Sequence, residues 1–232
     1  MSVERNLLIS LLKLTKEAPA LIEDVKKDAR LPTDLCWELL SKLQNDNLVY
    51  LNNDCVEVDS TNRLKIALKA GSLGADLQNL SDLLRWREFE EIAAIALKIN
   101  GYSVLNNVRF KHGKRRYEID VIGCKKPLVV CVDCKRWQHV IGASALKKIV
   151  DSQTDRTRSL ADSLPNINLN IECTIWEKAQ FIPVVLSLFP CAYKYIYKVP
   201  VVPVLQLQDF IFQLPAYIQA VKFFPKNFDK LT

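Results

Sequence analysis

The sequence predicts an α/β protein, in which a sandwich of helices around a central mixed sheet follows a small helical module at the N-terminus. Three observations lead to this prediction. Helical patterns fill most of the first hundred residues, three strand-like segments follow in succession, and helical and β-rich segments then alternate. The 232 residues are 49% hydrophobic and 25% charged, which is typical of a folded chain with one or two domains.

The first 60 residues form a pattern of their own. Three helical segments and a short strand pair are predicted at residues 4–16, 19–29, 33–46 and 48–58. Pro19 suits the first turn of the second helix, and Thr33 or Asp34 suits the N-cap of the third. Three helices followed by a hairpin are typical of a winged helix-turn-helix, so a winged-helix-like domain is expected over residues 1–60.

The third helix of this module is acidic. It carries Asp34, Glu38 and Asp46 against a single Lys42. DNA phosphates repel such a helix, because non-specific affinity for DNA depends on cationic contacts. The charge therefore favours dimerisation or protein docking by the module over DNA binding through this helix.

A helical linker is predicted over residues 61–84, with a break at Gly71-Ser72-Leu73-Gly74. A stronger helix follows from Arg87 to Asn100, and Gly101 is expected to end it as a C-terminal cap. The second domain is predicted to extend over residues 85–232.

Three successive strands form the centre of the second domain. They are expected at Tyr102–Val108, Tyr117–Gly123 and Leu128–Lys135, with a basic turn region between the first two. The third strand is almost continuously apolar, which indicates a central, buried position. A helix, two β-rich segments and a closing helix are expected at residues 143–163, 181–189, 199–205 and 209–220.

The positive charge of the chain is concentrated in one block. The net charge is +6, yet residues 98–148 alone hold 12 basic and 3 acidic residues, a net of +9. Such a block is the electrostatic footprint of a protein that binds a polyanion such as nucleic acid. A solvated surface without a partner is the alternative that charge alone leaves open.

Polar side chains interrupt the apolar third strand. Because strand side chains alternate, Asp133 and Lys135 point to one face, where they are costly unless paired or used in chemistry. The hairpin through residues 124–127 should bring Asp120 near Asp133. Two adjacent carboxylates repel unless a divalent cation lies between them, and their oxygens suit Mg²⁺ or Mn²⁺. Lys135 would then orient a water or stabilise charge on a phosphate.

A further carboxylate is available from the helix that precedes the strands. Glu90 follows Phe89 near the start of this helix, and Glu91 is the rival choice. Phe89 and Ile92 face inward, which does not separate the two glutamates.

These residues resemble the PD-(D/E)xK nuclease superfamily. The likeness is carried, in order, by Phe89-Glu90, Gly101-Tyr102, Glu118-Ile119-Asp120-Val121 and Val132-Asp133-Cys134-Lys135-Arg136. Within the superfamily, the chain is most similar to Mrr-type restriction endonucleases and archaeal Holliday-junction resolvases, over residues 85–210. The resemblance implies a restriction-endonuclease-like fold and a magnesium-dependent phosphodiesterase that acts on DNA.

The resemblance also implies a role for each site residue. Asp120 would be the central metal ligand, Asp133 the second ligand, and Lys135 the group that positions the attacking water. Glu90 would support the metal or the water. The backbone carbonyl of Cys134 would be a further ligand.

Three positions qualify the resemblance. Ile119 stands where the motif has its Pro, and Asp133 replaces the more frequent Glu, which shortens its reach by one methylene. Gln153, on the following helix, corresponds to an accessory Gln near the site of some relatives.

Other kinds of site are disfavoured. Cys131 and Cys134 are spaced like a CxxC motif, but residues three apart on a strand face opposite sides and cannot share a zinc ion. The chain has no glycine-rich phosphate loop, so no nucleotide cofactor is expected. It has neither a transmembrane run nor a signal-peptide pattern, and its seven scattered cysteines predict reduced thiols in a cytoplasmic protein.

These observations predict a Mg²⁺- or Mn²⁺-dependent endonuclease that cuts duplex, branched or junction DNA by in-line attack of an activated water. The DNA backbone would be held by Arg109, Lys111, Lys114, Arg115, Arg116 and Arg136. A homodimer is expected, because cutting both strands requires two sites. Two alternative functions stay open from the residues alone. The chain could be a non-catalytic DNA-binding protein that keeps the nuclease fold, or a nuclease that processes RNA.

Overall fold

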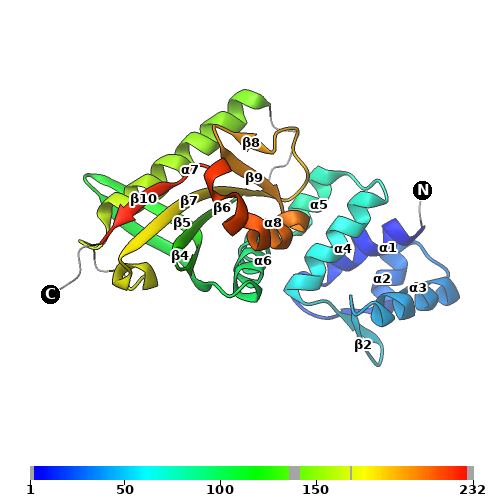
Figure 1. Ribbon diagram of the computed structural model, residues 1–232. Helices are drawn as coiled ribbons and strands as arrows, with labels where there is room; N and C mark the ends of the chain where they lie inside the picture. The colour runs from blue at the N-terminus through cyan, green and yellow to red at the C-terminus, as the bar shows by residue number, and fades with distance from the viewer. Residues whose placement is uncertain (1–2, 136–141, 168, 229–232) are drawn as a thin grey trace. The chain divides into compact units, whose positions relative to one another are not determined.

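The computed structural model describes residues 3–135, 142–167 and 169–228. The chain divides into two units, Met1–Glu91 and Ile92–Thr232. The predicted α/β class is confirmed, because the second unit is built around a seven-stranded mixed sheet with helices packed on it (Figure 1).

The first unit is mostly helical. Its helices are α1 (Val3–Leu14), α2 (Ile22–Ala29), α3 (Thr33–Asn45), α4 (Ser60–Ser72), α5 (Leu77–Leu83) and the start of α6 (Trp86–Ile99). Its strands, β1 (Ala20–Leu21), β2 (Tyr50–Asn52) and β3 (Cys55–Glu57), form an antiparallel sheet in the order β1-β3-β2. The helices and the hairpin expected here are therefore present, and their interpretation as a winged helix stays a prediction.

The second helix begins later than its sequence pattern indicates. Ala20 and Leu21 pair with Val56 and Cys55 of β3, so Pro19 precedes a strand and not a helical turn. Pairing with a strand distant in sequence thus outweighs the local preference of Pro for a helix start.

A buried ion pair ties the helices of this unit together. The Arg63 side chain is 1% exposed, and its Nε donates to Glu88 Oε1 at 2.7 Å. Its Nη1 donates to Thr15 Oγ1 at 3.0 Å, and its Nη2 to the backbone carbonyls of Leu12 and Leu83 at 2.8 Å each. A buried guanidinium with all of these partners links α1, α4, α5 and α6.

The second unit follows the predicted alternation of strands and helices. Its strands are β4 (Ser103–His112), β5 (Arg115–Lys125), β6 (Leu128–Lys135), β7 (Lys178–Ser187), β8 (Tyr195–Ile196), β9 (Val199–Pro203) and β10 (Phe224–Asn227). Its helices are the end of α6, α7 (Ala143–Ser163) and α8 (Leu207–Gln213), with short 3-10 turns η1 (Glu172–Ile175), η2 (Val204–Gln206) and η3 (Leu214–Ala220).

The sheet has the order β4-β5-β6-β7-β9-β8. β6 pairs antiparallel with β5 and parallel with β7, and it is buried from Leu128 to Cys134, which confirms the central position expected of it. β7 pairs with β10 through its first residues and with β9 through its last.

Helices cover both faces of this sheet. α7 runs along one face, where its Leu160 shares a core with Val129 and Cys131 of β6 (Figure 1). On the other face, β5 approaches α6 closely, since a Cβ atom at Gly123 would lie 2.7 Å from Leu97 Cδ2. Glycine is required there by the closeness of the two elements.

The cap expected at the end of α6 is present. Gly101 has a φ of 78°, and the N–H of Tyr102 donates to the carbonyl of Leu97 at 3.1 Å. This arrangement is a Schellman-type C-cap, which sets the chain on course for β4.

The basic region between the first two strands is not a loop. β4 continues to His112 and β5 begins at Arg115, so that Lys111 pairs with Arg116 up to a tight turn. Gly113 in this turn has a φ of 58°, which a glycine adopts without strain. The cross-strand ladder therefore reaches the tip of the hairpin.

The C-terminal segment also differs from expectation. The helix predicted over residues 209–220 is divided into α8 and the 3-10 turn η3, because Pro215 has no N–H to continue the α-helical bonding. β10 was not predicted, and its Phe224 pairs with Phe181 of β7.

All seven cysteines are free, as expected. No helix within residues 3–135, 142–167 and 169–228 is long and apolar enough to cross a membrane.

Candidate active site

The β4–β5 pair is irregular at Asp120. Regular pairing runs on both sides of this residue, but no ladder pair joins it to Asn107 in the described strands, and Asn107 has a φ of 52°. Ile119 and Ile122, which an unbroken strand would direct to opposite faces, both pack in the core beneath α7. The register is the same on both sides of Asp120, so neither strand has an inserted residue, but the side chains of β5 change faces at this point.

This irregularity directs the Asp120 carboxylate toward the backbone of β6. The β5–β6 ladder ends at the pair Val121–Val132, and the same register sets Asp120 opposite Asp133. The N–H of Cys134 donates to Asp120 Oδ2 at 2.7 Å. A charge-assisted hydrogen bond therefore holds Asp120 where the ladder between the two strands stops.

Asp133 carries its carboxylate in the protein interior. The side chain is 2% exposed, and its Oδ1 accepts from Lys135 Nζ at 2.9 Å and from Arg156 Nη1 on α7. The second oxygen, Oδ2, is buried without a hydrogen-bond partner. A buried polar atom left unpaired is costly, so it calls for a functional explanation.

The two cations beside Asp133 differ from it in exposure. The side chains of Lys135 and Arg156 are 27% and 29% exposed, so both extend from the interior toward solvent. Each can contact Asp133 and still reach an anion that arrives from outside. This combination suits a site that binds phosphate next to a buried carboxylate.

Gln153 lies on the α7 face that meets β6. It is fully buried, and its Nε2 donates to the Cys131 carbonyl at 2.7 Å, while its Oε1 has no hydrogen-bond partner. Residues three apart on a helix share a face, so Gln153 and Arg156 both face the strand that carries Asp133. The accessory role of Gln153 stays a prediction.

The two glutamates of α6 differ in exposure. Glu90 is 7% exposed, whereas Glu91 is exposed. A buried carboxylate is costly unless it is paired or used, whereas an exposed carboxylate needs no such explanation. Glu90 is therefore the better candidate of the two, and its participation in the site stays a prediction.

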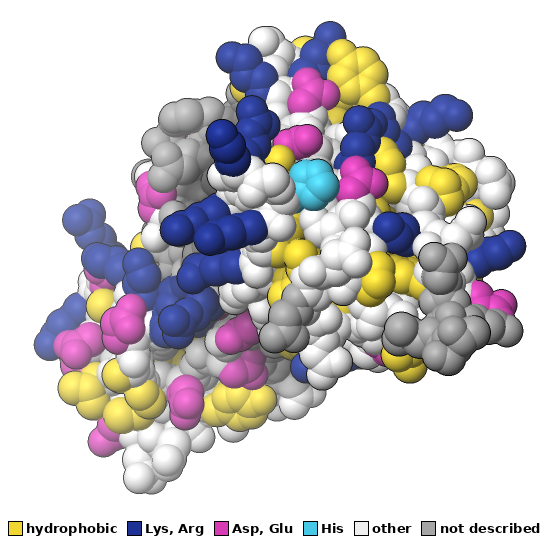
Figure 2. All heavy atoms as spheres, turned by 90° about the vertical axis from the view of Figure 1, so that its left-hand side faces the viewer, with side chains coloured by type: hydrophobic (Ala, Val, Ile, Leu, Met, Phe, Trp, Pro, Cys, Tyr) yellow, Lys and Arg dark blue, Asp and Glu magenta, His cyan; other side chains and the backbone are white. Residues whose placement is uncertain are grey.

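The predicted DNA-binding residues lie on the β4–β5 hairpin. Arg109, Lys111, Lys114, Arg115 and Arg116 are all exposed there, and Arg136 lies outside the described residues. Figure 2 views the molecule from the side of this hairpin tip and shows many Lys and Arg side chains on that face, with fewer Asp and Glu between them. Such a surface favours contact with a polyanion.

The carboxylates of Asp120 and Asp133 fit a divalent cation, because Oδ2 of Asp133 is buried without a hydrogen-bond partner. In the part of the chain that the structure describes, no three His, Cys, Asp or Glu side chains gather closely enough to enclose an ion. Mg²⁺ does not need such an enclosure, because it is usually held by one or two carboxylates and keeps several waters. Asp120 and Asp133 meet that requirement, and the Cys134 carbonyl stays a predicted third ligand.

Arg156 is the residue that the sequence did not reveal. Its spacing from Gln153 would have indicated that both residues share a face of the helix. It would not have indicated that this face meets Asp133, because the register between α7 and β6 depends on tertiary packing.

Comparisons with known proteins concern the segment that carries these residues. Residues 81–161 match the restriction endonuclease family, specifically the model of the Mrr catalytic domain. No curated protein matches the chain significantly.

Among solved structures, the crystal structure of protein VC1899 from Vibrio cholerae is 15% identical, with a TM-score of 0.36. The match covers 94% of this chain and 57% of that protein, so the chain spans little more than half of its length.

The matched segment includes Asp120, Asp133, Lys135 and Arg156. The segment of residues 81–161 therefore matches a restriction endonuclease domain of the Mrr type, which confirms the resemblance in the sequence and supports a nuclease-type function in general.

Proposed function

We propose that the chain is a metal-dependent DNA endonuclease, with Asp120, Asp133 and Lys135 at its active site. The observation that carries the proposal is the buried, partnerless Oδ2 of Asp133, next to a second carboxylate and two cations. Together with the family match, this arrangement supports phosphodiester hydrolysis better than a structural ion pair.

Asp120 and Asp133 would hold Mg²⁺ or Mn²⁺, with the Cys134 carbonyl as a further ligand and Glu90 in support. A bound divalent cation supplies Lewis-acid polarisation of the phosphate and lowers the pKa of the attacking water. Asp120 is held for this role by the N–H of Cys134.

Lys135 and Arg156 have separate tasks in this proposal. Lys135 extends from Asp133 to solvent, so its ammonium group can orient the attacking water or stabilise charge on the phosphate. Arg156 acts through Asp133 as a positioning residue, because its guanidinium fixes Oδ1 and leaves Oδ2 for the ligand.

The rest of the chain would serve binding and assembly. The basic hairpin holds the DNA backbone, and two copies of the chain supply two sites for cutting both strands. The acidic winged-helix-like module over residues 1–60 would provide the dimer contact. Free thiols suit a reducing compartment such as the cytoplasm.

A cleavage assay with Mg²⁺ or Mn²⁺ tests the proposal. Supercoiled plasmid, linear duplex, flaps and four-way junctions are incubated with the wild type, Asp120→Asn, Asp133→Asn and Lys135→Met. We expect metal-dependent cutting by the wild type and a loss of at least about a hundredfold in each variant. Asp162→Asn serves as the matched control, because it makes the same change from carboxylate to carboxamide at an exposed position on α7. This variant should cut normally.

The outcomes separate the alternatives. Salt-sensitive DNA binding without cutting would favour a non-catalytic DNA-binding protein. Cutting of RNA but not of DNA would favour an RNA-processing nuclease. Equal cutting by the wild type and Asp133→Asn would refute the assignment of the site.

A further inference from the structure

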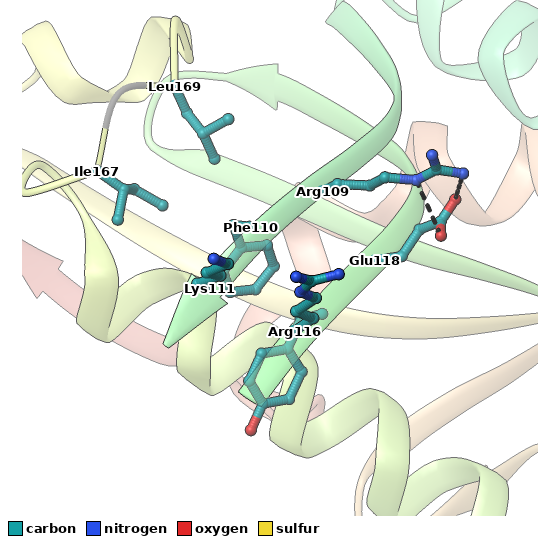
Figure 3. Close-up of a pocket in the computed structure, with 8 residues that line it drawn as sticks. Arg109, Phe110, Lys111, Arg116, Glu118, Ile167 and Leu169 are labelled. Carbon is teal, nitrogen blue, oxygen red and sulfur yellow. Dashed lines mark hydrogen bonds and ion pairs between the residues drawn. The ribbon is translucent and has the colours of Figure 1, made fainter. Parts of the chain in front are cut away.

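A hollow on the surface is lined by the same pair of strands, β4 and β5, that carries Asp120. It is a pocket of about 680 Å³, formed by the end of β4 and the start of β5, next to their turn, and by the segment that follows α7 (Figure 3). This volume is in the range of pockets that bind small molecules. β4 is an edge strand of the sheet, so the pocket opens at the side of the domain.

One wall of the pocket is apolar and aromatic. The rings of Phe110 and Tyr117 stack with their centroids 5.4 Å apart and their planes 19° apart. Ile167 and Leu169 line the pocket from the segment opposite β4, and both are only partly buried. A flat, apolar group could therefore lie between this segment and the strand pair.

The rim of the pocket carries an unusual pair of charges. Lys111 and Arg116 are directly opposite each other on the paired strands, and like charges in that position are destabilising. Both side chains are exposed, and neither has an ion-pair or hydrogen-bond partner within residues 3–135, 142–167 and 169–228. An anion placed between them would relieve this repulsion.

The acidic residue at the pocket is already neutralised. Glu118 accepts from Arg109 Nε and Nη2 at 3.2 Å each, in the fork geometry of a bidentate pair (Figure 3). The net charge at the rim is therefore positive, from Lys111 and Arg116. The pocket thus combines an apolar wall with an anion-binding rim.

We infer that this pocket binds a single unpaired nucleotide of a DNA strand, with its base against Ile167 and Leu169 and its phosphate between Lys111 and Arg116. A base within a duplex has both faces stacked, so only an unpaired or extruded base can enter such a pocket. The inference rests on the proposed function and narrows its substrate to DNA with unpaired nucleotides.

The position of the pocket relates it to cutting. Glu118 and Arg116 precede Asp120 by two and four residues on β5, which corresponds to about 7 Å and about 13 Å at the usual rise of a strand. A nucleotide in the pocket would therefore lie only a few nucleotides from the phosphate at the active site. Strand breaks are expected close to the unpaired position.

Binding in EDTA tests this inference without cutting. The probes are a short DNA duplex with one unpaired 2-aminopurine and the same duplex with that base paired, and both affinity and fluorescence are measured. We expect the wild type to bind the first duplex about tenfold more tightly, because burial of a base against apolar side chains favours binding by that order. We also expect the fluorescence of this duplex to rise on binding, because the base leaves the neighbouring bases that quench it.

Two variants and a charge-matched control complete the test. Leu169→Asn should abolish the preference and the rise in fluorescence. Lys111→Ala/Arg116→Ala should weaken binding of the unpaired probe more than that of the paired duplex. Lys147→Ala/Lys148→Ala removes the same charge from exposed positions on α7 and should retain the preference. An equal loss of preference for the unpaired probe in the two double variants would overturn the inference, because it would show only a general effect of charge.

The result is independent of catalysis. Asp133→Asn should retain the preference in EDTA even where it cuts nothing. A wild type that cuts DNA but binds both probes equally would refute the nucleotide pocket and leave the endonuclease proposal intact.

Discussion

The cluster of Asp133, Lys135 and Arg156 leads to a prediction about two variants. Replacing the partly exposed Arg156 should lower the free energy of unfolding more than replacing the buried Asp133. Arg156→Leu leaves the Asp133 carboxylate, which is 2% exposed, with one cation in place of two. A hydrogen bond to a charged group contributes about 1.5–3 kcal/mol, and the 29% exposure of Arg156 reduces that value. We expect Arg156→Leu to lower the free energy of unfolding by about 1–2 kcal/mol.

Asp133→Asn should cost less, although Asp133 is the more deeply buried partner. The substitution removes a charge whose burial is itself unfavourable. It leaves Lys135 and Arg156, which are 27% and 29% exposed and can turn to water. The free energy of unfolding should therefore change by less than about 1 kcal/mol in either direction, while cleavage is lost.

A double-mutant cycle measures the interaction between these two residues. In the Asp133→Asn background, Arg156→Leu should cost almost nothing, because the carboxylate that needed the guanidinium is absent. Unfolding in urea is followed by circular dichroism, and hydrogen exchange of the β6 peptide assigns the change to the second unit. Additive effects of the two substitutions, or a larger cost for Asp133→Asn alone, would refute the reasoning.

Three further variants test the packing and the buried polar groups. Gly123→Ala should destabilise by about 1–3 kcal/mol in urea unfolding, because its Cβ would meet the fully buried Leu97 at 2.7 Å. A hydrogen bond from Lys13 lowers the pKa of Asp28 from 3.8, so its stabilisation is present above about pH 4 and is lost as the pH falls through the lowered pKa. Asp28→Asn should therefore lower the melting temperature near neutral pH but not near pH 2. Burial raises the pKa of Tyr102 to about 12, and its hydroxyl has no hydrogen-bond partner. Tyr102→Phe should thus raise the free energy of unfolding in urea. Urea unfolding of the wild type at several pH values should show that stability is lost as the pH rises from about 10 through the raised pKa.

Segments with strong local patterns could be predicted closely from the sequence. The observed β6 and α7 begin and end at the predicted residues, Leu128–Lys135 and Ala143–Ser163. An uninterrupted apolar run has few alternatives to a buried strand, and a long amphipathic pattern has few alternatives to a helix. The position of Asp120 opposite Asp133 followed from the same local information, because a short turn joins their strands.

Features that depend on distant partners could not be predicted. β1 and β10 exist because Ala20 pairs with Val56 and Phe224 pairs with Phe181, and neither segment has a strand pattern of its own. The contact between Arg156 and Asp133 has the same origin, since it requires the packing of α7 on β6. Long-range pairing thus decides these elements where local preference is weak.

The charges at the proposed nucleotide pocket depend on the turn of the hairpin. Lys111 and Arg116 meet because the turn at Gly113 sets the register of the hairpin. A slip of one residue would set Lys111 opposite Arg115 or Tyr117, and it would exchange the faces of every side chain beyond the turn. The same slip would separate Arg109 from Glu118, whose ion pair therefore supports the register that brings the two unpaired cations together. The repulsion between Lys111 and Arg116 would be relieved by a phosphate between them, as the proposed binding of DNA requires.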